Sequence, residues 1–305
     1  PDLSSSAGSV QIQRGVGTSS NGAGAFGASI NFSSNEVNKQ PYAELNDSYG
    51  SFRSSKNTIK IGTGLKNGFT SEWRLSNITS DGFIDRASSK LRSFYFSTAH
   101  ITDKNSIRLN LFSGHEKTYQ AWYGVSQEDL NAGNRRVNYA GTERTGEPYD
   151  NETDNYTQSH AQLFIDHRFN SQWNFNTAFF LTKGKGYYEQ YKADQEFASY
   201  GLPDRINGQD TIRRADMVRQ LWLENYYYGN IFALQYSSAK NQATIGGSIT
   251  HYDGNHYGKL IWTSIVPVNK HRWYDLDALK TDVTIYAKEQ RKLNDKFSYY
   301  LDLQY

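Results

Sequence analysis

The sequence contains no cysteine, so disulfide bonds, thiolate metal sites and thiol nucleophiles are all excluded. Its 305 residues include only 5 prolines and 1 methionine. Neither sign of charge dominates, because 33 lysines and arginines balance 31 aspartates and glutamates for a net charge of +2. A chain with this balance offers no electrostatic argument for a nucleic-acid partner.

Long apolar runs are also missing. Fully apolar stretches such as residues 178–181 are only a few residues long, whereas a membrane-spanning helix needs about 20. The sequence therefore excludes a helical membrane protein. A transmembrane β-barrel remains compatible with the mean hydropathy of -0.76, because its lipid-facing residues alternate with polar ones. No basic and apolar leader opens the chain, and the opening residues favour a protein that begins upstream of residue 1.

Hydrophobic and polar residues alternate with a period of two from Tyr42 onward, which predicts strands with two different faces. Between residues 69 and 78, for example, Phe69, Trp73 and Leu75 occupy one face and polar residues the other. The same pattern recurs in residues 107–111, 162–169, 173–181, 282–288 and 297–304. We expect about a dozen such strands.

The links between these strands are of two kinds. Tight turns are expected at residues 66–68, 102–105, 170–172, 229–230 and 293–295, which are rich in Asn, Gly and Asp. Long polar loops are expected at residues 123–157 and 184–214, and strand parity is ambiguous at 239–242 and 253–258. Short turns on one rim and long loops on the other are typical of outer-membrane barrels. A soluble β-sandwich or propeller is the alternative that this pattern leaves open.

The first 35 residues differ from the rest, because Ser, Gly and Ala dominate them. Gly22, Gly24 and Gly27 form a G-x-G-x-x-G pattern, which in a dinucleotide-binding fold must be followed by a helix. The next residues alternate like a strand and reach a Ser-Ser-Asn stop, so no helix N-terminus is offered to a pyrophosphate. The pattern alone does not support a nucleotide site.

This segment resembles the C-terminal end of the plug domain in TonB-dependent outer-membrane receptors. The resemblance rests on Arg14-Gly15, an Asn-Gly-x-Gly-Ala turn from residue 21 and a Gly-x-x-Ile-Asn strand from Gly27. Alternating strands follow directly, as they do in that family. A weaker resemblance, in residues 114–122, is to the ferric-siderophore branch and particularly to Bacteroidota-type receptors.

The resemblance implies an all-β fold: a transmembrane antiparallel barrel, 22-stranded in the family, with an N-terminal plug. Residues 1–35 would be the end of the plug, with Arg14 facing barrel carboxylates, and residues 36–305 the first part of the barrel. A barrel of that size cannot close with this chain alone. The glycines would permit positive φ and close packing against the barrel wall.

The function implied by the resemblance is TonB-dependent import of a scarce nutrient complex across the bacterial outer membrane. The cargo expected first is a ferric siderophore. No enzymatic chemistry, cofactor or resident metal is expected, and the partners would be TonB through an absent segment, an iron chelate and outer-membrane lipid. Loop aromatics and arginines would hold an anionic chelate. The candidates are Tyr119, Trp122, Tyr123, Arg135, Arg136, Tyr139, Arg144, Tyr187, Tyr188, Tyr191, Arg213 and Arg214.

Other functions remain open from the sequence. Seven histidines raise haem as cargo, and cobalamin or another metal complex would suit the same family. His251 and His256 flank an Asp-Gly pair, which we interpret as a turn rather than a metal site. A passive porin or adhesion barrel would lack the plug segment, and a secreted hydrolase would need paired carboxylates. Each candidate ligand residue has an ordinary alternative as an interfacial anchor.

Overall fold

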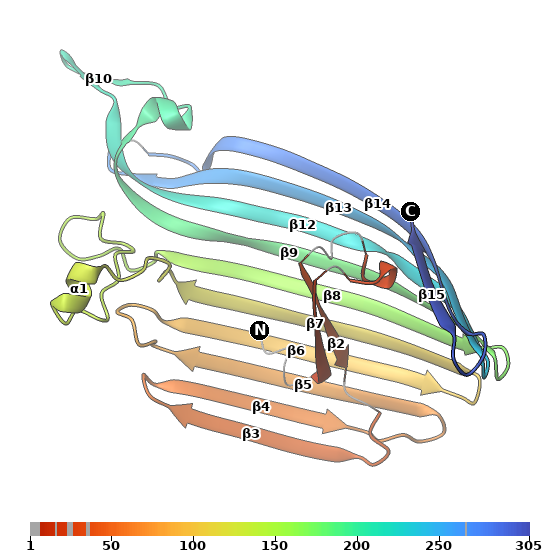
Figure 1. The fold of residues 1–305 in the computed structure, drawn as a ribbon. Coiled ribbons are helices and arrows are strands. Elements are labelled where there is room, and N and C mark those ends of the chain that lie inside the picture. The colour runs from red at the N-terminus through yellow and green to blue at the C-terminus, as the bar shows by residue number, and fades with distance from the viewer. Residues whose placement is uncertain (1–6, 16, 23–26, 35–36, 266) are drawn as a thin grey trace.

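The computed structural model describes residues 7–15, 17–22, 27–34, 37–265 and 267–305. One antiparallel sheet of 11 strands dominates it, in the order β15-β14-β13-β12-β9-β8-β7-β6-β5-β4-β3 (Figure 1). Consecutive strands therefore pair with one another, which is an up-and-down arrangement. The strands are β3 (Tyr42–Gly50), β4 (Ser54–Gly62), β5 (Phe69–Ser80), β6 (Ser89–Ile101), β7 (Asn105–Tyr119), β8 (Thr153–Arg168), β9 (Trp173–Glu196), β12 (Arg214–Ser237), β13 (Asn241–Thr263), β14 (His271–Lys292) and β15 (Ser298–Gln304).

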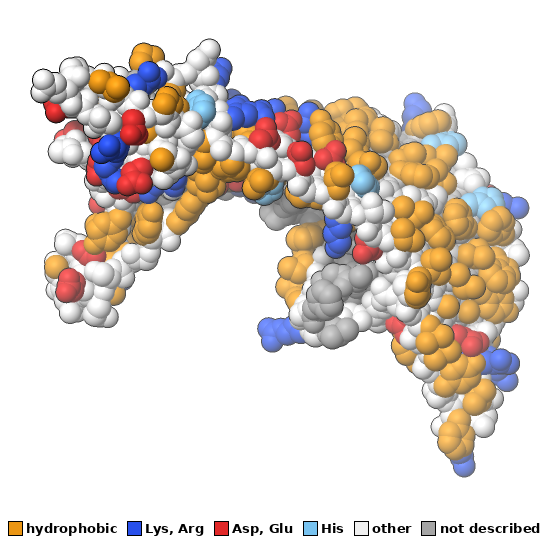
Figure 2. Space-filling model, turned by 90° about the horizontal axis from the view of Figure 1, so that it is seen from above, with side chains coloured by type: hydrophobic (Ala, Val, Ile, Leu, Met, Phe, Trp, Pro, Cys, Tyr) orange, Lys and Arg blue, Asp and Glu red, His pale blue; other side chains and the backbone are white. Residues whose placement is uncertain are grey.

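The sheet is curved and open. Its two edges, β3 and β15, do not pair with each other in the described part of the chain. Seen from above, the molecule forms an arch with a hollow on one side (Figure 2). Hydrophobic side chains crowd the half of the arch that lies toward the short turns, and charged side chains gather toward the long loops.

The predicted alternation is confirmed, and it separates two chemically different faces. On β5, Leu75 points outward and is 61% exposed, whereas its neighbour Arg74 points inward and is 1% exposed. Buried polar residues bond to one another on the inner face, as Thr58 does to Ser76 at 3.1 Å. The exposed apolar side chains of the outer face cover a far larger area than a monomeric soluble protein tolerates. The sandwich and propeller alternatives are thus inconsistent with the structure.

Four of the five predicted turns are confirmed. At residues 66–68 the chain reverses through Asn67 (φ 51°) and Gly68 (φ 81°), and Lys66 bridges Phe69. The prediction at 229–230 was wrong, since both residues lie inside β12. Position 229 requires a glycine because a β-carbon there would lie 2.3 Å from the carbonyl oxygen of Ile249 on β13.

Three further predictions about links can now be settled. The link at 239–242 is the hairpin turn between β12 and β13, but residues 253–258 lie within β13 and form no turn. The loop predicted at 184–214 was also wrong in its first part. Residues 184–196 continue β9 and pair with β12, so their polar composition reflects a strand that extends past the apolar band.

The remaining elements are small. The link from β9 to β12 holds the 3₁₀ turn η3 (Phe197–Tyr200) and the hairpin of β10 (Arg205–Asn207) with β11 (Asp210–Ile212). The loop of residues 120–152 holds α1 (Gln127–Asn131), capped by the Ser126 hydroxyl, which accepts from the Asp129 amide at 3.0 Å. None of the helices in the described ranges has the length and apolar character needed to cross a bilayer.

Candidate functional site

A short hairpin precedes the sheet and is drawn in front of its inner face in Figure 1. Strands β1 (Ala7–Arg14) and β2 (Ala28–Ser34) pair antiparallel, and the Gly15 amide donates to the Gly27 carbonyl at 2.8 Å. Gly15 and Gly22 have φ angles of 84° and 81°, a region that favours glycine. Gly24, the other glycine of the motif, lies outside the described residues. Arg14 is exposed at the end of β1.

The 3₁₀ turn η2 (Ser19–Asn21) anchors this hairpin to the far end of the sheet. The Ser19 amide donates to Asp302 Oδ2 at 3.1 Å, and Lys288 Nζ donates to Ser20 Oγ at 2.8 Å. Register and alternation place Lys288 and Asp302 on the inner face. A cavity of about 270 Å³ is lined by η2 together with β9, β12, β13 and β14. Two segments about 280 residues apart in sequence are thus joined by charged hydrogen bonds.

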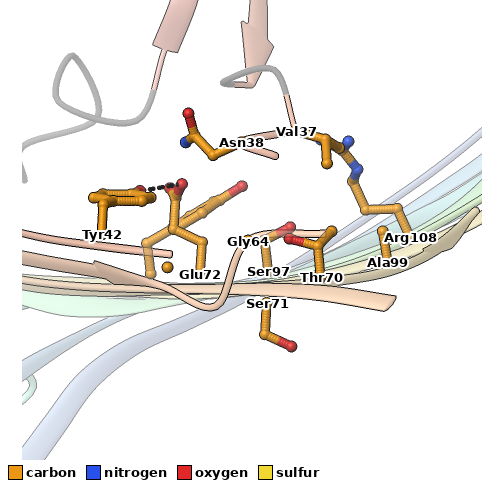
Figure 3. Close-up of a pocket in the computed structure, with 12 residues that line it drawn as sticks. Val37, Asn38, Tyr42, Gly64, Thr70, Ser71, Glu72, Ser97, Ala99 and Arg108 are labelled. Carbon is orange, nitrogen blue, oxygen red and sulfur yellow. Dashed lines mark hydrogen bonds between the residues drawn. The ribbon is translucent and has the colours of Figure 1, made fainter. Parts of the chain in front are cut away.

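A second contact region lies where the chain passes from the hairpin to β3 (Figure 3). Tyr42 donates its hydroxyl proton to Glu72 Oε2 at 2.5 Å on the inner face, and Asn38 and Arg108 line the same pocket. The pocket has a volume of about 30 Å³, which suits a single water molecule. It is too small for an organic ligand, and the bond from Tyr42 to Glu72 joins the start of β3 to β5.

The loops on the opposite rim pack against one another. Asn138, almost fully buried, donates to the carbonyls of Asp85 and Gln120 at 2.9 and 3.0 Å, and its Oδ1 accepts from the Ala140 amide at 3.0 Å. Residues 81–88 and 120–152 are thereby tied into one layer. This layer forms a firm base for the more exposed side chains above it.

The structure places seven of the predicted ligand residues in or beside this layer. Trp122 and Tyr123 are exposed by 58% and 49%, and Arg135 and Arg144 are exposed as well. The other three are engaged within the layer: Tyr119 donates to the Tyr149 carbonyl at 2.6 Å, Tyr139 donates to Asp129, and Arg136 lies 5.8 Å above the rings of both Phe52 and Phe83.

The five predicted residues of the second group are spread over both faces. Tyr188 points inward and Tyr187 outward, where its ring lies 4.5 Å from that of Trp222. Tyr191 is buried and donates to Asp216 Oδ2 at 2.5 Å. Arg213 pairs with Asp204 at 3.2 Å, and Arg214 pairs with Asp194 and Glu196. The structure therefore brings Tyr188, but not the other four, to the inner face beside the exposed loop residues.

An aromatic and cationic group forms at this mouth of the hollow, and we call Trp122, Tyr188, Arg219 and Tyr274 the mouth cluster. The Trp122 and Tyr188 rings meet edge to face at 5.5 Å. Tyr188, Leu221, Gly258 and Tyr274 form one cross-strand row, and the ring of Trp273 packs over the glycine, where a β-carbon would lie 2.4 Å from it. Such a group suits an anionic ligand through hydrogen bonds and cation–π contacts.

Two members of the mouth cluster, Arg219 and Tyr274, are absent from the sequence-based candidates. Arg219 is held by Gln190 Oε1 at 2.9 Å and by the Tyr200 hydroxyl at 3.1 Å. Alternation along β12 could have assigned Arg219 to the wet face. The shift in register between Gly258 and Lys259 made the orientation of Tyr274 inaccessible to sequence alone.

Burial and local hydrogen bonds shift the pKa of two carboxyl groups in the loop layer. Burial raises the pKa of Glu152, although the backbone amides of Gly141 and Tyr191 and the charge of Lys192 oppose the rise. The hydroxyl of Ser126, followed by that of Tyr139, lowers the pKa of Asp129 at the start of α1. The two carboxyl groups therefore differ in charge preference, and Glu152 is the one that resists ionisation.

Metal ligation by the histidine pair has no geometric basis. His251 and His256 lie an odd number of residues apart on β13, so their side chains point to opposite faces. The turn predicted between them was wrong, because both residues lie inside the continuous strand β13. Among the described residues no group of three or more His, Asp or Glu side chains could hold a metal ion.

Solved structures provide the comparison. The ferric-catecholate import receptor Fiu from Escherichia coli K12 superimposes with a TM-score of 0.73 at 15% identity, covering 98% of this chain and 49% of the receptor. The ferripyoverdine receptor of Pseudomonas aeruginosa gives 0.72 at 10% identity, covering 97% and 41%. The copper transporter OprC gives 0.65 at 11% identity, covering 97% and 41%. No protein-family model and no curated protein matches the sequence.

The chain thus has the fold of an outer-membrane receptor barrel, of which it spans just under half the length. More narrowly, the fold is that of the TonB-dependent receptors, and the described part of this chain forms an open segment of such a barrel wall. The matched proteins are named as import receptors and transporters rather than enzymes.

Proposed function

We propose that the protein of which this chain is part imports a nutrient complex across the bacterial outer membrane, with energy from TonB, and that the cargo is a ferric siderophore. The observation that carries the proposal is that η2, between the two strands of the hairpin, is bonded to the polar inner face of an arch whose outer face is apolar. An apolar exterior requires lipid, and a plugged interior requires a gated passage. Residues 1–35 would be the end of the plug and residues 36–305 the first part of the barrel.

The mouth cluster supports the proposal of an anionic cargo, because it combines a cation with aromatic rings. Arg219 supplies a cation that is already oriented by Gln190, and Trp122, Tyr188 and Tyr274 supply rings around it. Ferric siderophores are anionic chelates that offer oxygen atoms to such groups. The matched structures include ferric-siderophore receptors and a copper transporter, so another metal complex is the second candidate cargo.

The test is iron-limited growth of a strain with the complete receptor gene, supplied with single chelates, compared with matched strains that lack the gene or lack TonB. We expect growth on at least one ferric chelate to require both. Uptake that persists without TonB would overturn the transport mechanism. Growth that responds only to haem, cobalamin or copper would overturn the cargo.

Two neighbouring tyrosines then test the site. Tyr188→Ala removes an inward ring and should lower chelate affinity about tenfold, whereas Tyr187→Ala removes an outward ring and should leave affinity unchanged. Binding titrations with the purified receptor measure both. A loss confined to Tyr187→Ala would show that the mouth cluster is not the binding site.

A further inference from the structure

The short links between strands share one chemical feature, which is a cation on each of them. These links lie together at one end of the sheet, on the right in Figure 1. Four of them contain Lys66, Lys104, Lys240 and Lys296, and Arg168 ends β8 at the link to β9. All of these residues are exposed. We call this set of residues the basic rim.

Few carboxylates accompany the basic rim. The acidic residues of the short links are Asp103 and Asp295, and Asp295 pairs with Lys292 at 2.9 Å. No residue of the basic rim has an ion pair within the parts of the chain that the structure describes. At the other end of the sheet, acidic residues outnumber arginines in the loop of residues 120–152. The excess of cations is therefore specific to the short links.

The cations of the basic rim are regularly spaced around the arch. Because the sheet is an up-and-down one, a short link follows every second strand from the β4–β5 link to the β14–β15 link. With strands about 4.8 Å apart, the cations recur about every 10 Å. Exposed cations at such intervals attract a polyanion whose charges also repeat.

A groove of about 320 Å³ lies between the last two short links, with Lys240, Lys292 and Lys296 among its lining residues. This volume is at the lower end of the range for small-ligand pockets, about 300–1,000 Å³. Gln242 and Gln290 line the groove as well and lie opposite each other on the inner face. The groove therefore opens toward the inside of the arch and not toward lipid.

Amide side chains enable the groove to bind a peptide backbone. They belong to Asn241, Gln242, Gln290 and Asn294. The Oδ1 atom of Asn241 is buried and accepts no hydrogen bond from the described residues, so it is available to a backbone N–H. Apart from Ala239 and Phe297, polar and charged residues line the groove, whereas protein–protein interfaces usually have an apolar centre.

We propose that the basic rim binds a carboxylate-rich glycopeptide layer, the peptidoglycan, through the carboxylates of its stem peptides. The inference rests on the proposed function, which places the short links in the periplasm. The lysines would pair with the carboxylates, and the amide side chains of the groove would bond to the peptide backbone. A repeating layer can contact several links at once, so that individually weak ion pairs add up.

The experiment measures how the complete receptor, purified in detergent, cosediments with protease-treated peptidoglycan sacculi and with the same sacculi after their carboxylates are converted to amides. We expect at least about tenfold higher affinity for the unmodified sacculi at low salt, and a smaller difference at high salt. Lys240→Gln with Lys296→Gln should lower this affinity about fivefold. Lys90→Gln with Lys270→Gln removes the same charge near the long loops and should not change it.

Equal affinity for the two sacculus preparations, or equal losses in the two double variants, would overturn the inference. Binding that is lost when attached proteins are removed by protease would assign the basic rim to an acidic protein and overturn it as well. Chelate-dependent growth is measured in the same strains. Normal growth with equal affinities refutes the peptidoglycan contact alone, whereas growth that never depends on the receptor refutes the proposed function. Heat-dependent mobility on gels confirms that each variant is folded.

Discussion

At the scale of single residues, the loop layer shows how a side chain can serve the fold rather than a ligand. From the sequence, Arg136 is predicted to be an exposed cation that binds an anionic chelate. In the structure its guanidinium stacks on Phe52 and Phe83 and pairs with Asp85 at 3.3 Å. Three separate loops contact one another at this arginine. No local pattern in the sequence predicts these contacts.

Glu152 gives the loop layer a predictable response to pH. Burial raises its pKa when the loop is packed as in the structure, which we call the closed form, so protonation favours that form, and closure weakens as the pH rises through the raised pKa. The opening equilibrium changes by up to about tenfold for each pH unit between the open-loop and closed-loop pKa. No histidine lies in residues 120–152 to obscure this dependence.

Hydrogen exchange of residues 120–152, corrected for intrinsic rates, measures this effect. Glu152→Gln should make the protection nearly independent of pH and at least as strong at pH 8 as in the parent. Glu147→Gln, at an exposed position of the same loop, should keep the parent's dependence. Protection that increases with pH in the parent would contradict the assignment.

At the scale of the strands, glycines on the inner face accept tyrosine rings from neighbouring strands. A β-carbon at Gly186 would lie 2.2 Å from the Asn155 carbonyl oxygen and 2.6 Å from the Tyr156 ring. Gly246 faces Tyr286 in the same way, with 2.5 Å to its hydroxyl. These close approaches explain why glycines within β9 and β13 do not mark turns, which is where turn rules failed.

Gly186→Ala should therefore destabilise the folded receptor by about 1–3 kcal/mol, because the backbone of β8 would have to move. Guanidinium unfolding in micelles, followed by gel mobility, measures the change. Gly124→Ala is the matched control, since nothing lies within 4 Å of its β-carbon. Equal midpoints for the two variants would refute this account of the inner face.

At the scale of the whole molecule, the hairpin and the far strands depend on each other. The bond from the Ser19 amide to Asp302 joins η2 to the last strand, β15. A hydrogen bond to a carboxylate is worth about 1.5–3 kcal/mol. This contact should hold η2, and with it the hairpin, against the wall of the sheet.

Asp302→Ala should speed amide exchange in residues 17–22 by about tenfold or more, without changing exchange in the loop layer. Hydrogen exchange with mass spectrometry on the complete receptor measures both regions. Asp295→Ala, which removes an exposed carboxylate at the short-turn rim, serves as control. Unchanged exchange at residues 17–22 in Asp302→Ala would show that this anchor does not hold the hairpin.

The sequence by itself determined the strands, their two faces and most of the turns, because alternation and turn chemistry are local properties. By resemblance, the pattern from Arg14 to Asn31 also predicts a plug segment. Only the tertiary structure decided that residues 184–196 extend β9 and that Tyr188 and Arg219 share one face. The same holds for the hydrogen bond that Asp302 accepts from the Ser19 amide. These features depend on register, bulges and contacts between distant segments, which arise only when the sheet is assembled.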